Sequence, residues 1–297
     1  MIKHLGLKAY GKINLGLDVL RRKEDGYHEV RMIMQTVGIF DRVDIIWKEE
    51  PGIQVETNLY YLPTNENNLV YKAAKLLMDE FGVTDGVTIK LKKFIPVAAG
   101  MAGGSSDAAA VLFGVNKMFR LGLTIPQLME RGVKIGADVP YCILRGTALS
   151  EGIGEVLTPL PPVPQCQVLI AKPAINVSTK FVYENLHAND LLPGQHPDID
   201  AIIDSIRKND IYGIADNLGN VLETVTIKEY PVIRELKEKM LEYGAIGSLM
   251  SGSGPTVFGL FTNPRAAEAA YEALRFGKYA KLAKQVYLTG FYNVKRD

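Results

Sequence analysis

A proline-rich segment near the middle of the chain limits every fold that the chain can adopt. Residues 158–164 contain four of its fifteen prolines. Because proline has a fixed φ and no backbone N–H, such a segment cannot lie inside a sheet or continue a helix. A chain of 297 residues also exceeds the roughly 150 residues expected of one domain. We therefore predict two domains, residues 1–157 and 158–297.

Composition and charge are those of an ordinary globular protein. Hydrophobic residues make up 47% and charged residues 23%, which excludes a disordered or collagen-like chain. The 34 basic side chains nearly balance the 33 acidic ones, so no strong field attracts a polyanion, and we expect no nucleic-acid partner.

Cysteine usage and the first residues indicate the compartment. Cys142 and Cys166 form neither a disulfide framework nor a metal-ligand spacing, which fits a reducing cytoplasm. The first eight residues lack the apolar core of a signal peptide, and no apolar run approaches the ~18 residues of a membrane helix. We expect a cytoplasmic protein with no membrane partner.

Hydrophobic periodicity predicts an α+β chain. The alternation of Ile13, Leu15 and Leu17, followed by the turn Asp25-Gly26, predicts an N-terminal hairpin. In the N-terminal part we expect strands over 13–19, 30–37, 43–47, 87–91 and 141–144 and helices over 68–81, 108–119 and 126–135. In the C-terminal part we expect an antiparallel sheet with strands over 168–171, on both sides of residues 250–256 and over 286–292, and helices between 178 and 243 and from Pro264.

A glycine-rich loop followed by a helix is the strongest functional signal. In residues 96–107, PVAAGMAGGSSD, small side chains allow backbone N–H groups to approach an anion, and the following helix directs its positive end toward it. The loop is neither a Walker A motif nor a Rossmann fingerprint. The alternative is a flexible loop in which Ser105, Ser106 or Asp107 only caps the helix.

One face of the first strand and one aspartate have both a functional and a structural interpretation. Lys12, Asn14 and Gly16 share one face of the first strand, which places a cation and an amide on one surface or simply forms a solvated face. Asp138 lies on a predicted connection, where it either activates a hydroxyl or hydrogen-bonds its own turn.

Two short segments are the remaining candidates: residues 250–256, MSGSGPT, and residues 25–28, DGYH. The first is a tight hairpin or a second oxyanion site, and two such loops favour a phosphorylated ligand. In the second, Tyr27 and His28 either stack on and hydrogen-bond a base or only pack. The other histidines, His4, His187 and His196, show no zinc-ligand spacing.

Together these segments resemble the GHMP kinase superfamily, whose three motifs correspond to residues 9–15, 96–109 and 250–258. Within it, DGYH at 25–28, GGSSDAA at 103–109 and GADVP at 136–140 are similar to the branch that phosphorylates 4-diphosphocytidyl-2-C-methyl-D-erythritol. The resemblance implies ATP-dependent transfer to the 2-hydroxyl of this substrate, in the non-mevalonate route to isoprenoid precursors. It also implies an N-terminal domain like ribosomal protein S5 domain 2, a C-terminal ferredoxin-like domain and an active site in the cleft between them.

The resemblance assigns roles to individual residues. Lys12 and Asp138 would be the catalytic pair, with Asn14 positioning the substrate. Mg²⁺ would be held by Ser105 or Ser106, or ordered by Asp107. The residues expected around ATP are Pro96, Gly100, Met101, Ala102, Gly103, Gly104, Ser105, Ser106 and Asp107, with Lys93 and Asn68 near the nucleotide. Because Met101 and Ala102 depart from the superfamily's Gly-Leu-Gly run, Gly103 and Gly104 are expected to approach phosphate most closely.

The substrate end follows in the same way. His28 would bind the cytosine edge, while Tyr27 and Tyr183 sandwich the ring, with Phe181 as the alternative to Tyr183. The remaining residues expected at the substrate are Thr179, Gly252, Ser253 and Gly254. The alternatives are another GHMP kinase of the homoserine or mevalonate type, or a non-catalytic RNA-binding module. We expect a monomer or a weak homodimer.

Overall fold

The computed structural model describes residues 2–294, which form two compact units. Unit 1 contains residues 2–11, 39–97 and 102–144, and unit 2 contains residues 12–38, 98–101 and 145–294. Each unit is therefore assembled from several segments of the chain. The boundary at 157/158 stays a prediction for the division into family domains.

Two long strands contribute to both units. β1 (His4–Arg22) and β2 (His28–Lys48) form the predicted hairpin, and both are longer than the sequence pattern indicates. In unit 1 the sheet continues through β4 (Gly86–Lys92), antiparallel to β2, to β3 (Gly52–Thr57), parallel to β4. Ile45 and Ile89 are among its fully buried apolar side chains.

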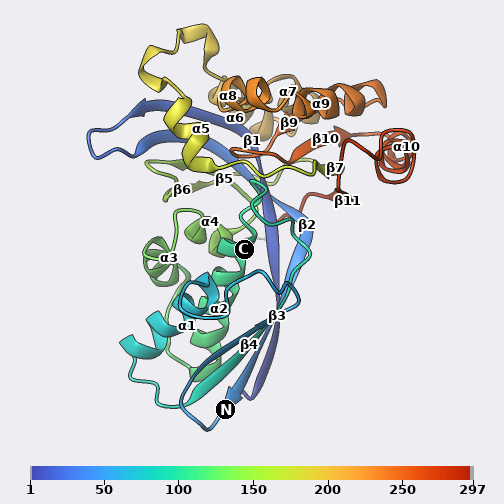
Figure 1. Cartoon of the computed structure of the whole chain (residues 1–297). Helices are drawn as coiled ribbons and strands as arrows, with labels where there is room; N and C mark the ends of the chain where they lie inside the picture. Colours follow the sequence, from blue (N-terminus) through green and yellow to red (C-terminus); the bar gives the residue numbers. More distant parts are fainter. Residues whose placement is uncertain (1, 295–297) are drawn as a thin grey trace. The chain divides into compact units, whose positions relative to one another are not determined.

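Four helices complete unit 1. α1 (Leu69–Glu80) and α2 (Gly103–Phe119) pack against each other and lie on one face of the sheet (Figure 1). Gly114 of α2 allows this close approach, since a Cβ there would lie 2.4 Å from Ile45 Cδ1. α3 (Ile125–Val133) and α4 (Val139–Leu144) pack beside α2.

Two details of unit 1 correct the sequence predictions. Residues 141–144, expected as a strand, belong to helix α4. A short buried apolar run does not distinguish strand from helix, and Pro140 is tolerated in a first helical turn. Helix α2 has no serine or aspartate cap: it begins at Gly103, and its N-cap Ala102 adopts a left-handed conformation without a side-chain cap bond.

Unit 2 contains the other strands. β5 (Thr147–Glu151) pairs with β2, β6 (Val156–Pro159) pairs with β5 at the sheet edge, and the short β8 (Gly219–Asn220) pairs in parallel with β1. A separate sheet has the order β11-β7-β10-β9 and is antiparallel throughout, as predicted. Its strands are β7 (Gln167–Lys172), β9 (Gly247–Met250), β10 (Val257–Phe261) and β11 (Gln285–Gly290).

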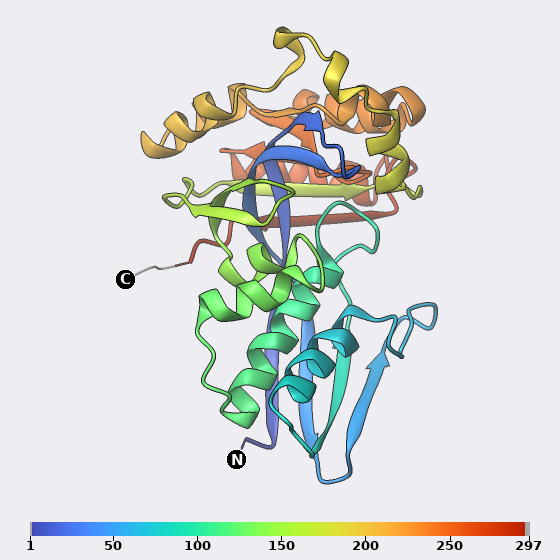
Figure 2. The ribbon, with the colours of Figure 1, turned by 90° about the vertical axis from the view of Figure 1, so that its left-hand side faces the viewer.

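The helices of unit 2, coloured yellow to red in Figure 2, lie between residues 178 and 243 and from Pro264, where the sequence predicts helices. α9 (Val232–Glu242) and α10 (Pro264–Arg275) pack against the antiparallel sheet. The others are α5 (Thr179–Asn185), α6 (Ile199–Arg207), α7 (Ile211–Asp216) and α8 (Glu223–Glu229), with short 3-10 turns η1 (Ala188–Asp190) and η2 (Pro193–Gln195) between α5 and α6. The α+β class is confirmed. Within residues 2–294, every helix is too short or too polar to span a bilayer.

Candidate active site

A buried cation and amide lie side by side on β1. Lys12 is 5% exposed and Asn14 is fully buried, and the lysine Nζ donates to Asn14 Oδ1 at 2.8 Å. Their shared face is confirmed, and it is not solvated. Gly16 continues this face and faces α6, where a Cβ would lie 2.6 Å from Ile202 Cδ1.

The two predicted phosphate loops contact each other in unit 2. Gly100 has a φ of +70°, and a Cβ there would lie 2.0 Å from the Ser251 carbonyl oxygen. Ser251 Oγ donates to the Gly100 carbonyl at 2.9 Å, and the Lys12 backbone N–H donates to the Met101 carbonyl at 3.1 Å. The glycine at 100 is thus required by the close approach of residues 98–101 to residues 250–256, which we call the motif-three loop.

The motif-three loop is also joined to α5. Ser253 Oγ lies 2.9 Å from Thr179 Oγ1, in the first turn of this helix. Ser178 caps the helix by accepting from the Phe181 N–H. One turn after Thr179, the ring of Tyr183 packs 5.0 Å from the ring of His28, between centroids. The structure therefore brings together residues predicted from three separate motifs.

His28 has an unsatisfied ring nitrogen. Its Nε2 is one of three buried side-chain polar atoms, among residues 2–294, that lack a hydrogen-bond partner. Burial, followed by the charge of Arg22, lowers the pKa of His28 below its ordinary value, so the imidazole is neutral near pH 7. Tyr27, the neighbouring residue, is 61% exposed. A neutral imidazole beside aromatic rings is suited to the edge of an uncharged heterocycle.

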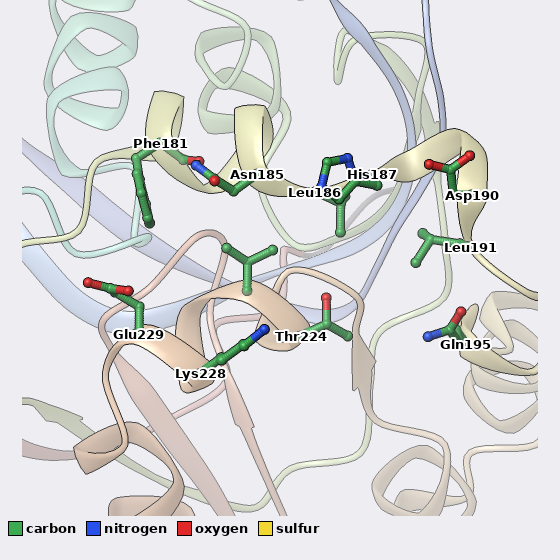
Figure 3. A pocket seen from close by; sticks show the side chains of 11 residues that line it. Phe181, Asn185, Leu186, His187, Asp190, Leu191, Gln195, Thr224, Lys228 and Glu229 are labelled. Atoms are coloured by element: carbon green, nitrogen blue, oxygen red, sulfur yellow. The ribbon is translucent and has the colours of Figure 1, made fainter.

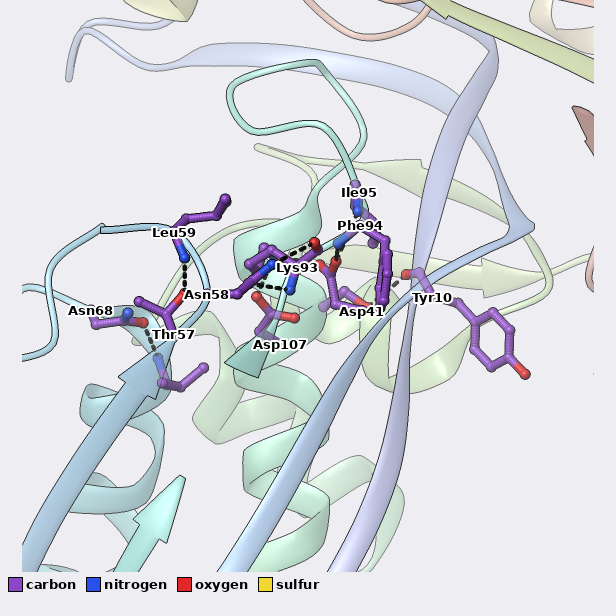
Figure 4. A network of polar contacts seen from close by, with 12 residues as sticks. Tyr10, Asp41, Thr57, Asn58, Leu59, Asn68, Lys93, Phe94, Ile95 and Asp107 are labelled. Carbon is purple, nitrogen blue, oxygen red and sulfur yellow. Dashed lines mark hydrogen bonds and ion pairs between the residues drawn. The ribbon is translucent and has the colours of Figure 1, made fainter. Parts of the chain in front are cut away.

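A buried ionic cluster anchors the first turn of α2 in unit 1 (Figure 4). Lys93 Nζ binds a carboxylate oxygen of Asp41 and Oδ2 of Asp107, the latter at 2.5 Å. Asp41 Oδ1 also accepts from the backbone N–H groups of Phe94 and Ile95. The stretch before the glycine-rich loop and the helix after it are thereby tied together.

Burial, followed by the neighbouring charges, shifts the pKa values of two members of this cluster, Asp107 and Lys93. Burial raises the pKa of Asp107 to about 7, and the charge of Lys93 only partly opposes this. Burial opposes the charged form of Lys93 too, but the charges of Asp107 and Asp41 raise its pKa overall. The second oxygen of Asp107, Oδ1, is buried without a hydrogen-bond partner. Asp41 is absent from the predicted set, although an acidic residue within an apolar β-like stretch is a usable signal.

The other residues predicted around ATP have varied surroundings. Ser106 Oγ is not a helix cap but donates to the Tyr10 carbonyl at 2.6 Å. Asn68 caps α1, accepting from Val70 N–H and donating to the Pro63 carbonyl. Of the remaining predicted residues in the loop and the first turn of α2, Pro96 and Met101 are buried, Ala102, Gly103 and Ser105 are half-buried, and Gly104 is exposed.

Asp138 is half-buried and directly precedes α4, on a connection as predicted. Its backbone carbonyl accepts from the Cys142 N–H at 3.0 Å, the first bond of that helix. Asp138 belongs to unit 1 and Lys12 to unit 2. Their action as a catalytic pair stays a prediction.

Comparison with known proteins places these residues in a family. Models of the GHMP kinase N-terminal domain and of the GHMP kinase C-terminal domain match residues 68–146 and 202–280. The 4-diphosphocytidyl-2-C-methyl-D-erythritol kinase of Lachnoclostridium phytofermentans is 55% identical over 98% of both chains. That of Lachnospira eligens is 54% identical, over 97% of this chain and 98% of its own. The chain belongs to the GHMP kinases, in the 4-diphosphocytidyl-2-C-methyl-D-erythritol kinase family.

Solved structures agree with this family assignment. A crystal structure of 4-(cytidine 5'-diphospho)-2C-methyl-D-erythritol kinase matches with a TM-score of 0.80 and 32% identity, covering 98% of this chain and 100% of that one. Homoserine kinase from Cytophaga hutchinsonii matches with a TM-score of 0.79 but only 20% identity, covering 97% and 95%, and so shows the fold alone. The GHMP kinase fold expected from the three motifs is confirmed.

This GHMP kinase has a further pocket in unit 2, of about 640 Å³, between α5, the turns η1 and η2, and α8 (Figure 3). Phe181, the alternative to Tyr183 in the predicted cytosine sandwich, lines this pocket together with Lys228 and Glu229. Tyr183 instead contacts His28. The choice of Tyr183 rather than Phe181 for the cytosine sandwich stays a prediction.

Proposed function

We propose that this chain transfers the γ-phosphoryl group of ATP to the 2-hydroxyl of 4-diphosphocytidyl-2-C-methyl-D-erythritol, giving the 2-phosphate and ADP. The observation that carries the proposal is the buried, unpaired Nε2 of His28 next to the ring of Tyr183. Homoserine and mevalonate contain no base, so kinases of those types have no use for such a pair. Family membership removes the RNA-binding alternative.

At the cytosine, we propose that neutral His28 hydrogen-bonds the base edge while Tyr27 and Tyr183 stack on its faces. The exposed ring of Tyr27 and the ring of Tyr183 beside His28 support these roles. Thr179 and the residues Gly252, Ser253 and Gly254 would contact the rest of the substrate, a role supported by the 2.9 Å contact between Thr179 and Ser253.

At the accepting hydroxyl, we propose that Lys12 stabilises the negative charge of the transferred group and that Asp138 accepts or orients the hydroxyl proton. Phosphoryl transfer depends on alignment and charge stabilisation more than on covalent chemistry. The bond from Lys12 to Asn14 fixes both side chains. Asn14 Nδ2 lies 3.5 Å from Met32 Sδ, a weak acceptor, and can therefore donate to a substrate oxygen instead.

At the ATP phosphates, we propose that the loop and the N-terminus of α2 bind the anion, with Gly103 and Gly104 closest to it. Mg²⁺ bound with a nucleotide needs only one or two protein oxygens besides the phosphates. The unpaired Oδ1 of Asp107 fits such a role, directly or through water. Because the hydroxyl proton of Ser106 is donated to Tyr10, we propose Ser105 as the serine nearer the metal. Bound Mg²⁺ would neutralise phosphate charge.

The reaction would take place in the cytoplasm. Neither Cys142 nor Cys166 forms a disulfide within residues 2–294, which supports a reducing compartment. Burial raises the pKa of Cys166 to about 12, so this thiol is unreactive at neutral pH.

A coupled ADP-release assay tests the function. With Mg-ATP, we expect turnover of the cytidylated substrate and none of homoserine, mevalonate or galactose. Lys12→Met and Asp138→Asn should each lower kcat by about 100-fold or more with little change in melting temperature. Lys8→Met, an exposed position on the same strand, is the matched control and should keep full activity. Full turnover in both site variants would contradict the assignment of the catalytic pair.

A further inference from the structure

Asn220 makes three hydrogen bonds from a buried position next to the motif-three loop. It is 7% exposed, and its Nδ2 donates to two carbonyls of the loop, those of Met250 and Gly252, each at 2.8 Å. Its Oδ1 accepts from the Leu222 N–H at 3.0 Å, which fixes the orientation of the amide. Both ends of the side chain are therefore used.

Two neighbouring side chains hold the same loop. Glu223 Oε1 accepts from the Met250 N–H at 2.8 Å, while its Oε2 binds Lys237 Nζ at 2.6 Å. Thr226 Oγ1 lies 3.4 Å from the Ser253 carbonyl. Residues 219–226, which we call the loop cradle, thus contact the backbone of the loop at four points.

The loop cradle is itself attached to β1. β8 pairs in parallel with β1, with Gly219 opposite Gly16 and Asn220 opposite Leu17. The Val221 N–H adds a bond to the Leu17 carbonyl at 3.0 Å. β1 is the strand that carries Lys12 and Asn14, so within unit 2 the loop cradle links that strand to the motif-three loop.

Because the peptide bond is planar, the hydrogen bonds of Asn220 also fix the direction of a neighbouring backbone N–H. In a trans peptide the carbonyl and the N–H of the following residue point in opposite directions. Holding the Gly252 carbonyl toward Asn220 therefore turns the Ser253 N–H away from Asn220. A backbone N–H fixed in this way is a preorganised donor for an anionic oxygen.

We propose that Asn220 is a positioning residue that aims the Ser253 N–H at the diphosphate of the cytidylated substrate. This inference rests on the proposed function, because it takes the motif-three loop as the substrate side of the site. No motif in the sequence indicates Asn220, which lies 30 residues before the first loop carbonyl that it binds.

Asn220→Asp is the sharpest test, because it keeps the shape and the acceptor but replaces the two donated hydrogens by an oxygen that faces two carbonyls. Asn220→Ala removes the donors without adding charge and serves if the aspartate variant does not fold. Asn217→Asp is the matched control: Asn217 Nδ2 donates to the Gly213 carbonyl of α7 at 2.8 Å and not to a carbonyl of the loop.

The first readout is hydrogen exchange of the free protein. In the Asn220 variants, we expect the amides of Ser251 and Gly254, which are bonded within the loop, to exchange about tenfold faster or more, and those of the control to be unchanged. Unchanged exchange in both Asn220 variants would overturn the positioning role, whether or not the chain is a kinase.

The second readout is steady-state kinetics. We expect KM for the cytidylated substrate to rise about tenfold, while KM for ATP stays within about twofold. Equal loss for both substrates, together with a lower melting temperature, would show a structural role only and overturn the proposal. If the wild-type chain does not bind the cytidylated substrate, the proposed function fails, and with it the substrate assigned to Ser253, while the exchange result still decides the role of Asn220.

Discussion

At the scale of single residues, the neutral state of His28 has consequences for stability and for activity. Its pKa is lowered in the folded chain, so the unfolded chain binds this proton more readily. The free energy of unfolding should therefore decrease as the pH falls below 6.5, the ordinary value for histidine, toward the lowered value. Binding of the cytidylated substrate should weaken over the same range, because protonation makes both ring nitrogens donors and leaves the ring without an acceptor.

His28→Gln removes both effects. We expect this variant to lose less stability than the wild type between pH 7.5 and 5, measured by urea unfolding. Its kcat/KM for the cytidylated substrate should fall by about 10- to 100-fold at pH 7.5, the loss expected for one buried hydrogen bond. His187→Gln, at an exposed position, should match the wild type in both measurements. If His28→Gln loses as much stability as the wild type between pH 7.5 and 5, another titrating group is responsible for the pH dependence.

Several site residues could be predicted from the sequence, and their partners could not. Strand alternation placed Lys12 and Asn14 on one face correctly, because period two is a local property. Asp41 meets Lys93 across 52 residues, and Asn220 meets Gly252 across 32. Such pairs arise only when strands and loops assemble, and no single-sequence pattern encodes them. The interpretation of the Lys12 face as solvated was wrong for the same reason.

At the scale of elements, the contact between the two loops depends on Gly100. A left-handed alanine costs about 1–2 kcal/mol relative to glycine. At Gly100 the Cβ would additionally collide with the Ser251 carbonyl, 2.0 Å away. Gly122 has a similar φ, +76°, with nothing within 4 Å of its Cβ, and so isolates the conformational cost.

We therefore expect Gly100→Ala to lower the free energy of unfolding by about 1–3 kcal/mol more than Gly122→Ala. Denaturant unfolding of the two variants measures this difference. Gly100→Ala should also lower kcat/KM, whereas Gly122→Ala should not. Equal free energies of unfolding for the two variants would show that separating the two loops does not destabilise the fold.

Element types were predicted correctly where alternation or a helix-start residue marks them, and the prediction was wrong for one short buried apolar run. The C-terminal sheet and α10 follow from alternation and from Pro264 at the helix start. α4 has only six residues, and its sequence fits a buried strand equally well. The sequence predicted that helix α2 starts at residue 108, whereas it begins at Gly103. The left-handed Ala102, and not a capping side chain, ends the turn before it. Burial in the folded chain therefore determines that α4 is a helix, and the backbone conformation of Ala102 determines where α2 begins.

At the scale of the whole molecule, we propose that one chain supplies every residue of the site. A monomer, or a homodimer that forms weakly, should therefore have the same activity per subunit. We expect constant specific activity over a roughly 100-fold range of enzyme concentration, compared with the mass distribution from sedimentation over that range. Activity that rises with the dimer fraction would mean that a second subunit contributes to the site.

The segments of the two units alternate along the sequence, and this restricts how the gene can recombine. Unit 1 is complete by residue 144, but unit 2 contains residues 12–38 and 98–101 as well as residues 145–294. A single crossover with a homologous gene at that point would deliver unit 1 from one parent and unit 2 from both. The motif-three loop of one parent would then contact residues 98–101 of the other parent, and the loop cradle of one parent would pair with β1 of the other. Lineages that exchange parts of this gene are therefore expected to keep the first strands matched to the C-terminal loops.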